Sequence, residues 1–104
     1  MDLAVDIYQL TKTWPREELY GLTSQVRRAA TSVAANIAEG YGRDNLGSYV
    51  QFLRIAQGSL KEVETHLLIA QRVGLTEDVD AQLSQTEAVG KVLRGLIRKL
   101  AEGL

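Results

Sequence analysis

The chain has 104 residues, so we expect one domain, 1–104, that is large enough to bury a core and gains stability from oligomerisation. Twelve basic residues against 13 acidic ones give a formal net charge of -1, which excludes any global attraction to nucleic acid or an anionic membrane. The absence of cysteine excludes disulfides and thiolate chemistry, and with no apolar span of about 18 residues or signal peptide we expect a cytoplasmic protein.

The spacing of apolar residues predicts four helices, of which the first is short and the second rich in alanine. The first ends at Pro15, because proline cannot continue a helix interior. The second begins near Thr23 or Ser24, both candidate N-caps, and is stopped by Gly40 and Gly42. Their apolar positions are Leu3, Ile7, Leu10 and Trp14 in the first helix, and Val26, Ala30, Val33 and Ile37 in the second.

The third and fourth predicted helices are longer and more regular. The third starts at Leu46 and ends at Gly74, with apolar residues alternating at intervals of 3 and 4, as along the seam of a helical bundle. The fourth opens at Thr76, with Glu77 and Asp78 in its first turn, where the helix dipole favours negative charge. The seam positions are Leu46, Tyr49, Leu53, Ala56, Leu60, Val63, Leu67 and Ala70, followed by Val79, Leu83, Thr86, Gly90, Leu93, Ile97 and Leu100.

Short connections between long helices favour antiparallel neighbours, so the sequence predicts an all-α, antiparallel up-down-up-down four-helix bundle with a short first helix. A third helix of about 28 residues is roughly 40 Å long, whereas a first helix of about 12 residues is roughly 18 Å long. Part of the apolar seam is then open to water, and such a strip usually marks an association surface. Alanines in the second helix would allow a close helix approach there, or they simply pack within one bundle.

Four segments of the chain resemble a known family. They are GLTSQVRRA (21–29), NIAEGYGR (36–43), FLRIAQGSLKEVETHLLIAQRVG (52–74) and GLIRKL (95–100). Together they are similar to the four-helix bundle proteins encoded by intervening sequences in bacterial 23S ribosomal RNA genes. The resemblance implies a bacterial cytoplasmic homopentamer with no established enzymatic activity. A related branch, the accessory proteins of diversity-generating retroelements, engages RNA and reverse transcriptase through a strongly basic surface, from which this near-neutral chain departs.

Four arginines are candidates for contact with RNA or with another subunit. Arginine binds phosphate through two parallel hydrogen bonds, so a cluster of them could form a phosphate-binding patch. Neighbouring helix positions point about 100° apart, however, and two adjacent arginines cannot both face one ligand squarely. The alternative, which we favour, is that one of them pairs with Glu39, Glu62 or Glu64 across a bundle or subunit interface. The four candidates are Arg27, Arg28, Arg43 and Arg54.

Two further groups of polar residues have a candidate role in the bundle. Glu62, Glu64 and His66 suggest a metal site, but a di-iron bundle needs Glu-x-x-His from each of two helices and this chain has one histidine. We therefore expect no metal and no other cofactor. Asn36 and Glu39 lie near the end of the second helix, where polar groups close to a seam can fix register and oligomeric state.

No motif in the chain supplies a nucleophile with its base or a phosphate-binding loop, so we do not expect an enzyme. The four tyrosines, Tyr8, Tyr20, Tyr41 and Tyr49, are not interleaved with basic residues as in a base-stacking surface, and we expect them at an interface or at the core boundary. Our leading hypothesis is a homo-oligomeric scaffold or adaptor whose protein partner is unidentified. The alternative is an RNA-binding accessory protein associated with ribosomal RNA or with a retroelement reverse transcriptase.

Overall fold

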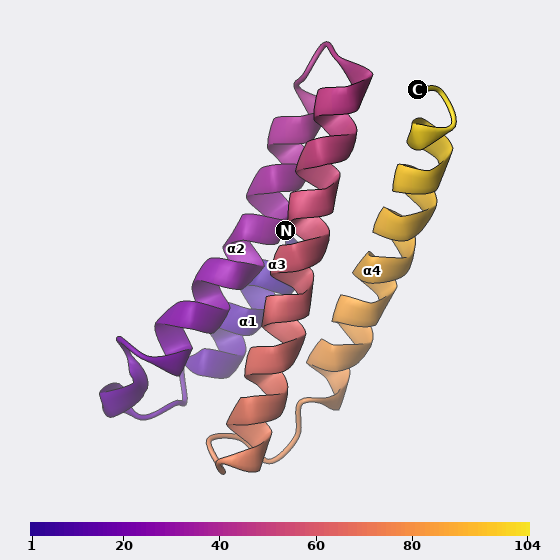
Figure 1. The fold of residues 1–104 in the computed structure, drawn as a ribbon. Coiled ribbons are helices and arrows are strands. Elements are labelled where there is room, and N and C mark those ends of the chain that lie inside the picture. Colours follow the sequence, from indigo (N-terminus) through magenta and orange to yellow (C-terminus); the bar gives the residue numbers. More distant parts are fainter.

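Four α-helices and one short 3-10 helix make up the fold in the computed structural model, which describes residues 1–104 (Figure 1). They are α1 (Asp2–Thr11), the 3-10 helix η1 (Arg16–Glu18), α2 (Leu22–Tyr41), α3 (Leu46–Arg72) and α4 (Asp80–Ala101). Figure 1 shows α2, α3 and α4 running alongside one another in alternating directions, with α1 behind their lower half. The predicted all-α up-down-up-down bundle with a short first helix is confirmed. None of the helices is both long enough and apolar enough to cross a membrane.

Each helix packs against two neighbours, and the core lies between them. α2 contacts α1 and α3, while α4 contacts α3 and α1, and the diagonal pairs have no close backbone contact. The core is one cluster of 17 buried apolar residues, and burying each large one contributes about 1.5–3 kcal/mol. The predicted seam of the third helix is confirmed from Leu53 to Ala70, whereas Leu46 and Tyr49 are only half-buried. The completely buried apolar residues include Ile7, Val26, Leu53, Val63, Leu67 and Leu93.

Several helix boundaries differ from the sequence prediction. α2 begins at Leu22, with Gly21 at its N-cap, and not near Thr23 or Ser24. α4 begins at Asp80 and not at Thr76. The reason is Val79, which is completely buried in the core in a non-helical conformation, while the Asp78 side chain accepts a hydrogen bond of 2.9 Å from the Asp80 amide. Burial of this valine anchors the connection, so the chain before it cannot add an exposed helical turn. α1 ends at Thr11 and not at Pro15 as predicted, although Trp14, which lies beyond the end of the helix, is still buried.

Glycines set both the end of α3 and the closest approach of two helices. Gly74 has a positive φ of 84°, which reverses the chain after α3, and the next amide donates to the Ala70 carbonyl at 2.9 Å. Gly40 does not stop α2, which runs on to Tyr41. It is buried, and a Cβ atom there would lie only 2.9 Å from the Phe52 Cβ. The absence of a side chain at Gly40 therefore allows α2 to approach α3 closely.

Candidate functional site

An apolar cleft lies where α1 leaves the bundle uncovered. α1 has 10 residues and α3 has 27, which correspond to about 15 Å and about 40 Å of helix. The N-terminus lies near the middle of the molecule in Figure 1, so α1 runs beside only part of the length of α2, α3 and α4. The cleft has a volume of about 310 Å³ between α1, α2 and α4. Its apolar lining consists of Met1, Leu3, Ala4, Ala30, Val33, Ala34, Ile37 and Val89.

Apolar side chains continue beyond this cleft along α2 and α4. Tyr41 follows Ile37 by one helical turn, and Val92 and Leu96 follow Val89 at the spacing that keeps residues on one helix face. The Tyr41 side chain is 78% exposed and that of Val92 is 68% exposed. We call the cleft together with Tyr41, Val92 and Leu96 the open strip. The uncovered seam that the unequal helix lengths predicted is therefore present.

Arg27 and Arg28 line one cavity on the outer side of α2. The cavity has a volume of about 680 Å³ and also contains Tyr8 of α1 and Tyr20 from the connection before α2. The Arg27 guanidinium carbon lies 4.7 Å from the centre of the Tyr8 ring, and its Nε donates a hydrogen bond of 2.7 Å to the Thr11 hydroxyl. The remaining lining residues are Leu19, Ser24, Thr31, Ser32 and Ala35. We call this site the tyrosine–arginine cavity.

The tyrosine–arginine cavity corrects one expectation from the sequence. Tyr8 and Tyr20 are separated from the paired arginines along the chain, and from that separation we expected no aromatic surface beside basic residues. The expectation is wrong for these two tyrosines, because the connection before α2 folds back and brings them to the same cavity as Arg27 and Arg28. The arginines can both line it because the cavity is open and extends around the exposed side of α2.

The other two candidate arginines lie at separate places. Arg43, just after α2, forms an ion pair of 2.6 Å with Glu39, and its guanidinium carbon lies 4.8 Å from the centre of the Phe52 ring. Arg54 lines a different cavity, of about 380 Å³, in the groove between α3 and α4, where Glu64 is also found. The structure thus brings Arg27 and Arg28 together, apart from Arg43 and Arg54. No carboxylate of the chain forms an ion pair with either member of the first pair.

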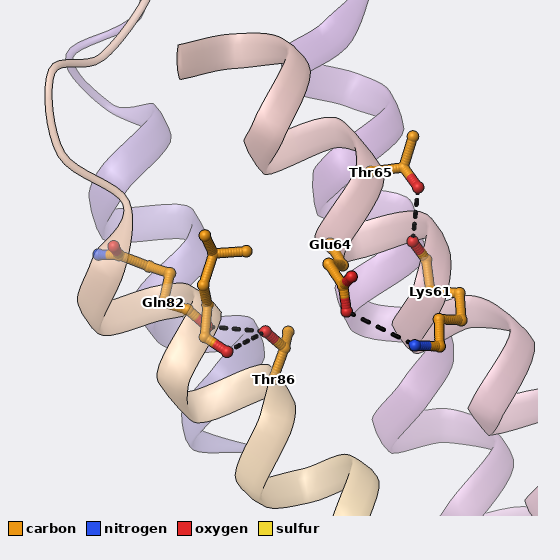
Figure 2. A network of polar contacts seen from close by, with 6 residues as sticks. Lys61, Glu64, Thr65, Gln82 and Thr86 are labelled. Carbon is orange, nitrogen blue, oxygen red and sulfur yellow. Dashed lines mark hydrogen bonds and ion pairs between the residues drawn. The ribbon is translucent and has the colours of Figure 1, made fainter. Parts of the chain in front are cut away.

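Side-chain bonds beside the α3–α4 groove stay within each helix, as Figure 2 shows. On α3, the Lys61 ammonium lies 3.7 Å from the Glu64 carboxylate, and the Thr65 hydroxyl donates to the Lys61 carbonyl at 2.9 Å. On α4, the buried Thr86 hydroxyl lies 3.0 Å from the Gln82 carbonyl oxygen and 2.7 Å from the Leu83 carbonyl oxygen. Because no such bond crosses the groove, apolar packing holds α4 against α3.

Asn36 supports a polar link between α2 and α3. Its amide nitrogen donates to the Ser32 carbonyl at 2.9 Å and lies 3.0 Å from the Ser32 hydroxyl. That hydroxyl in turn lies 2.8 Å from the Ser59 hydroxyl on α3. The serine pair was not identified from the sequence, although Ser59 falls between seam residues Ala56 and Leu60 and is buried. The small polar residue Ser59 beside the apolar seam was the sequence signal from which the serine pair could have been predicted.

Glu62 and His66 line a third cavity, between α2 and α3, of about 530 Å³. Arg28 also lines this cavity, without an ion pair to Glu62. The Nδ1 atom of His66 is buried and has no hydrogen-bond partner. No three histidine, aspartate or glutamate side chains are grouped so that they could hold a metal ion.

Comparison with known proteins identifies one family. The family model described as 23S rRNA-intervening sequence protein matches residues 1–95 of the chain. This range extends from the N-terminus through α3 and into α4. No curated relative matches the sequence. The resemblance inferred from the four sequence segments is confirmed.

Proposed function

The chain belongs to the 23S rRNA-intervening sequence protein family, and on that premise we propose that it is a non-enzymatic homo-oligomeric bundle that acts as a scaffold or adaptor. The stoichiometry implied by the family resemblance is five copies. In this proposal the assembled bundle presents several identical faces to a partner. No resident cofactor is needed, because the function is carried by association and not by chemistry.

The open strip is the observation that supports this proposal. Val92 and Tyr41 expose large side chains that the short α1 leaves uncovered, and the adjoining cleft is lined mainly by apolar residues. Apolar surface contributes about 25 cal/mol for each Å² that is removed from water. A helix from a second copy would therefore gain free energy by lying along the strip. A stable interface needs about 800 Å² on each partner, so contacts beyond the strip would contribute as well.

A matched pair of substitutions tests the proposed assembly. Val92→Asp puts a carboxylate into the open strip, and Val73→Asp makes the same change at the end of α3, where valine is 65% exposed. An unpaired charge buried in an interface costs several kcal/mol, so Val92→Asp should weaken self-association by more than tenfold. Val73→Asp should leave it nearly unchanged. Both proteins should keep the helical circular dichroism spectrum of the wild type, because neither valine is buried within the protomer.

Sedimentation velocity over a range of protein concentrations measures the association. The expected result is a defined wild-type oligomer without added ligand, dissociation of the Val92→Asp protein, and normal assembly of the Val73→Asp protein. A wild-type protein that stays monomeric at every concentration would refute the proposal. Equal assembly of the two variants would show that the open strip is not the interface.

RNA binding is the second candidate function, and the tyrosine–arginine cavity favours it. Arg27 and Arg28 lie on one open surface without carboxylate partners, and symmetry would repeat that surface in every copy of an oligomer. Binding through phosphate contacts should fall steeply as the salt concentration rises. Binding of single-stranded RNA should also be lost after Arg27→Ala and Arg28→Ala, with less effect from Arg43→Ala, because Arg43 already pairs with Glu39. Binding that is absent or insensitive to salt would exclude this function.

A further inference from the structure

We propose that the tyrosine–arginine cavity binds a nucleotide unit, meaning an aromatic base that carries a phosphate. The site is formed within one protomer, by α1, the connection before α2, and α2 itself. The inference therefore goes beyond the proposed assembly and does not depend on the number of copies. It rests on the second candidate function only where the nucleotide belongs to RNA.

Tyr20 provides a free aromatic surface for the base. Its side chain is 92% exposed, more than that of any other large apolar or aromatic residue in the chain, and it makes no aromatic contact within the protomer. Core packing therefore gives no reason for a tyrosine at this position. Stacking of a nucleic acid base on an aromatic side chain contributes about 1–3 kcal/mol and needs only an accessible ring face. The position of Tyr20 on the cavity wall supplies such a face.

Arg27 and Arg28 provide the positive charge for the phosphate. The Tyr8 ring and the Thr11 hydroxyl hold the Arg27 guanidinium in place through its carbon and its Nε atom. Its two terminal nitrogens have no hydrogen-bond acceptor on the chain, and Arg28 has none either. Terminal guanidinium nitrogens bind phosphate oxygens in pairs, with a geometry that lysine does not offer. A guanidinium that is already positioned loses less entropy when it binds.

The absence of carboxylates distinguishes this cavity from the other arginine-containing cavities. The groove between α3 and α4 contains Arg54 and Arg94 but also Glu64 and Glu87. The cavity between α2 and α3, which shares Arg28 with the tyrosine–arginine cavity, contains Glu62. A phosphate in either place would meet a negative charge. The tyrosine–arginine cavity has no acidic lining residue. Its volume of about 680 Å³ also lies within the range of small-molecule sites, which is about 300–1,000 Å³.

Three probes test the proposed ligand on the protein in its own oligomeric state. Saturation-transfer NMR measures binding of adenosine 5′-monophosphate and of ribose 5-phosphate, which lacks the base. Fluorescence anisotropy measures binding of a labelled single-stranded RNA of six adenylates. The nucleotide should bind at least fivefold more tightly than ribose 5-phosphate, because only the nucleotide can stack. If the RNA binds more tightly than the mononucleotide, the site serves single-stranded RNA, and equal affinities identify a free nucleotide as the ligand.

Substitutions in the cavity separate a specific site from general charge attraction. Tyr20→Ala should weaken binding of the nucleotide at least fivefold, whereas Tyr20→Phe should retain it. Arg28→Ala should weaken binding at least tenfold, whereas Arg98→Ala, an exposed arginine in the last turn of α4, should have no such effect. All four substitutions change exposed residues and remove no buried packing, and sedimentation should show unchanged assembly for each variant.

The proposal is overturned if no nucleotide binds, or if ribose 5-phosphate binds as tightly as the nucleotide. It is also overturned if Tyr20→Ala and Arg28→Ala bind like the wild type. These outcomes are distinct from failure of the proposed assembly, because the mass of the wild-type oligomer is measured without any nucleotide. A protein that assembles but binds no nucleotide refutes the site alone.

Discussion

Gly40→Ala tests how closely α2 approaches α3, and we expect it to destabilise the fold. The added Cβ would lie 2.9 Å from the Phe52 Cβ, 3.1 Å from a ring carbon of Tyr49 and 3.2 Å from the Tyr49 carbonyl oxygen. The Phe52 Cβ and the carbonyl oxygen cannot move aside by rotation of a side chain, so the two helices have to separate slightly. Gly40 is buried, and no open space is available to relieve the contact.

The magnitude follows from two opposing contributions. Inserting a methyl group into a filled core costs about 1–3 kcal/mol, while replacing glycine by alanine in a helix interior gains up to about 1 kcal/mol. The gain is smaller at Gly40, which is the last residue but one of α2. We therefore expect the free energy of unfolding to fall by about 1–2 kcal/mol. Urea unfolding at one fixed protein concentration measures it, since the stability of an oligomer depends on concentration.

Gly58→Ala is the matched control, with the opposite expected sign. Gly58 lies in the middle of α3, and a Cβ there would meet no atom within 4 Å, so the free energy of unfolding should rise by about 1 kcal/mol. If Gly40→Ala proves as stable as the wild type, the close approach of α2 and α3 is wrong. Destabilisation of both variants alike would show that glycine acts at these positions through something other than the space around it.

Two further substitutions test local features of α2 and α3. Asn45→Ala removes the side chain that accepts a 3.0 Å hydrogen bond from the Ser48 amide at the start of α3 and should cost about 1 kcal/mol by urea unfolding. Asp44→Ala, one residue earlier and without such a bond, should be nearly neutral, and an equal loss in both variants would contradict the capping role. Ser32→Ala removes the partner of Ser59 and should cost about 1–2 kcal/mol. Unchanged stability would show that the serine link contributes nothing.

The bundle could be predicted from the sequence because the apolar period records the buried face of each helix directly. Leu53, Val63 and Leu67 recur at intervals that keep them on one face, and all three are completely buried. The start of α4 could not be predicted in the same way. Thr76 has the chemistry of an N-cap, but the tertiary burial of Val79 decides where the helix begins, and a local pattern does not contain that information.

The role of a glycine inside a helix also depends on tertiary contacts that the local sequence does not show. Glycine inside a helix costs about 1 kcal/mol relative to alanine, and a close helix contact is one explanation for keeping it there. At Gly90 a Cβ would lie 3.3 Å from a side-chain nitrogen of Arg94 on the same helix and 3.4 Å from a Leu60 methyl carbon, so the explanation applies there only in part. It is wrong for Gly58 within one protomer, since the space beside it is open.

The tyrosine–arginine cavity could be predicted only in part. Arg27 and Arg28 were candidates because of their charge and their position on one helix. Tyr8 and Tyr20 reach the same cavity through the turn that the chain makes after α1. The spacing of the tyrosines and arginines along the sequence does not show where that turn places them, so the position of the two tyrosines could be seen only in the structure.

Native mass spectrometry of the wild-type protein, purified gently from its own cells with and without ribonuclease treatment, tests the central claim of self-assembly most directly. We expect one defined oligomer whose mass is a whole multiple of the 11.5 kDa chain and which persists after ribonuclease. A heavier species that ribonuclease reduces to that oligomer would add RNA as a bound partner. A spectrum of monomer alone, under conditions that preserve other protein assemblies, would show that the protein does not self-assemble.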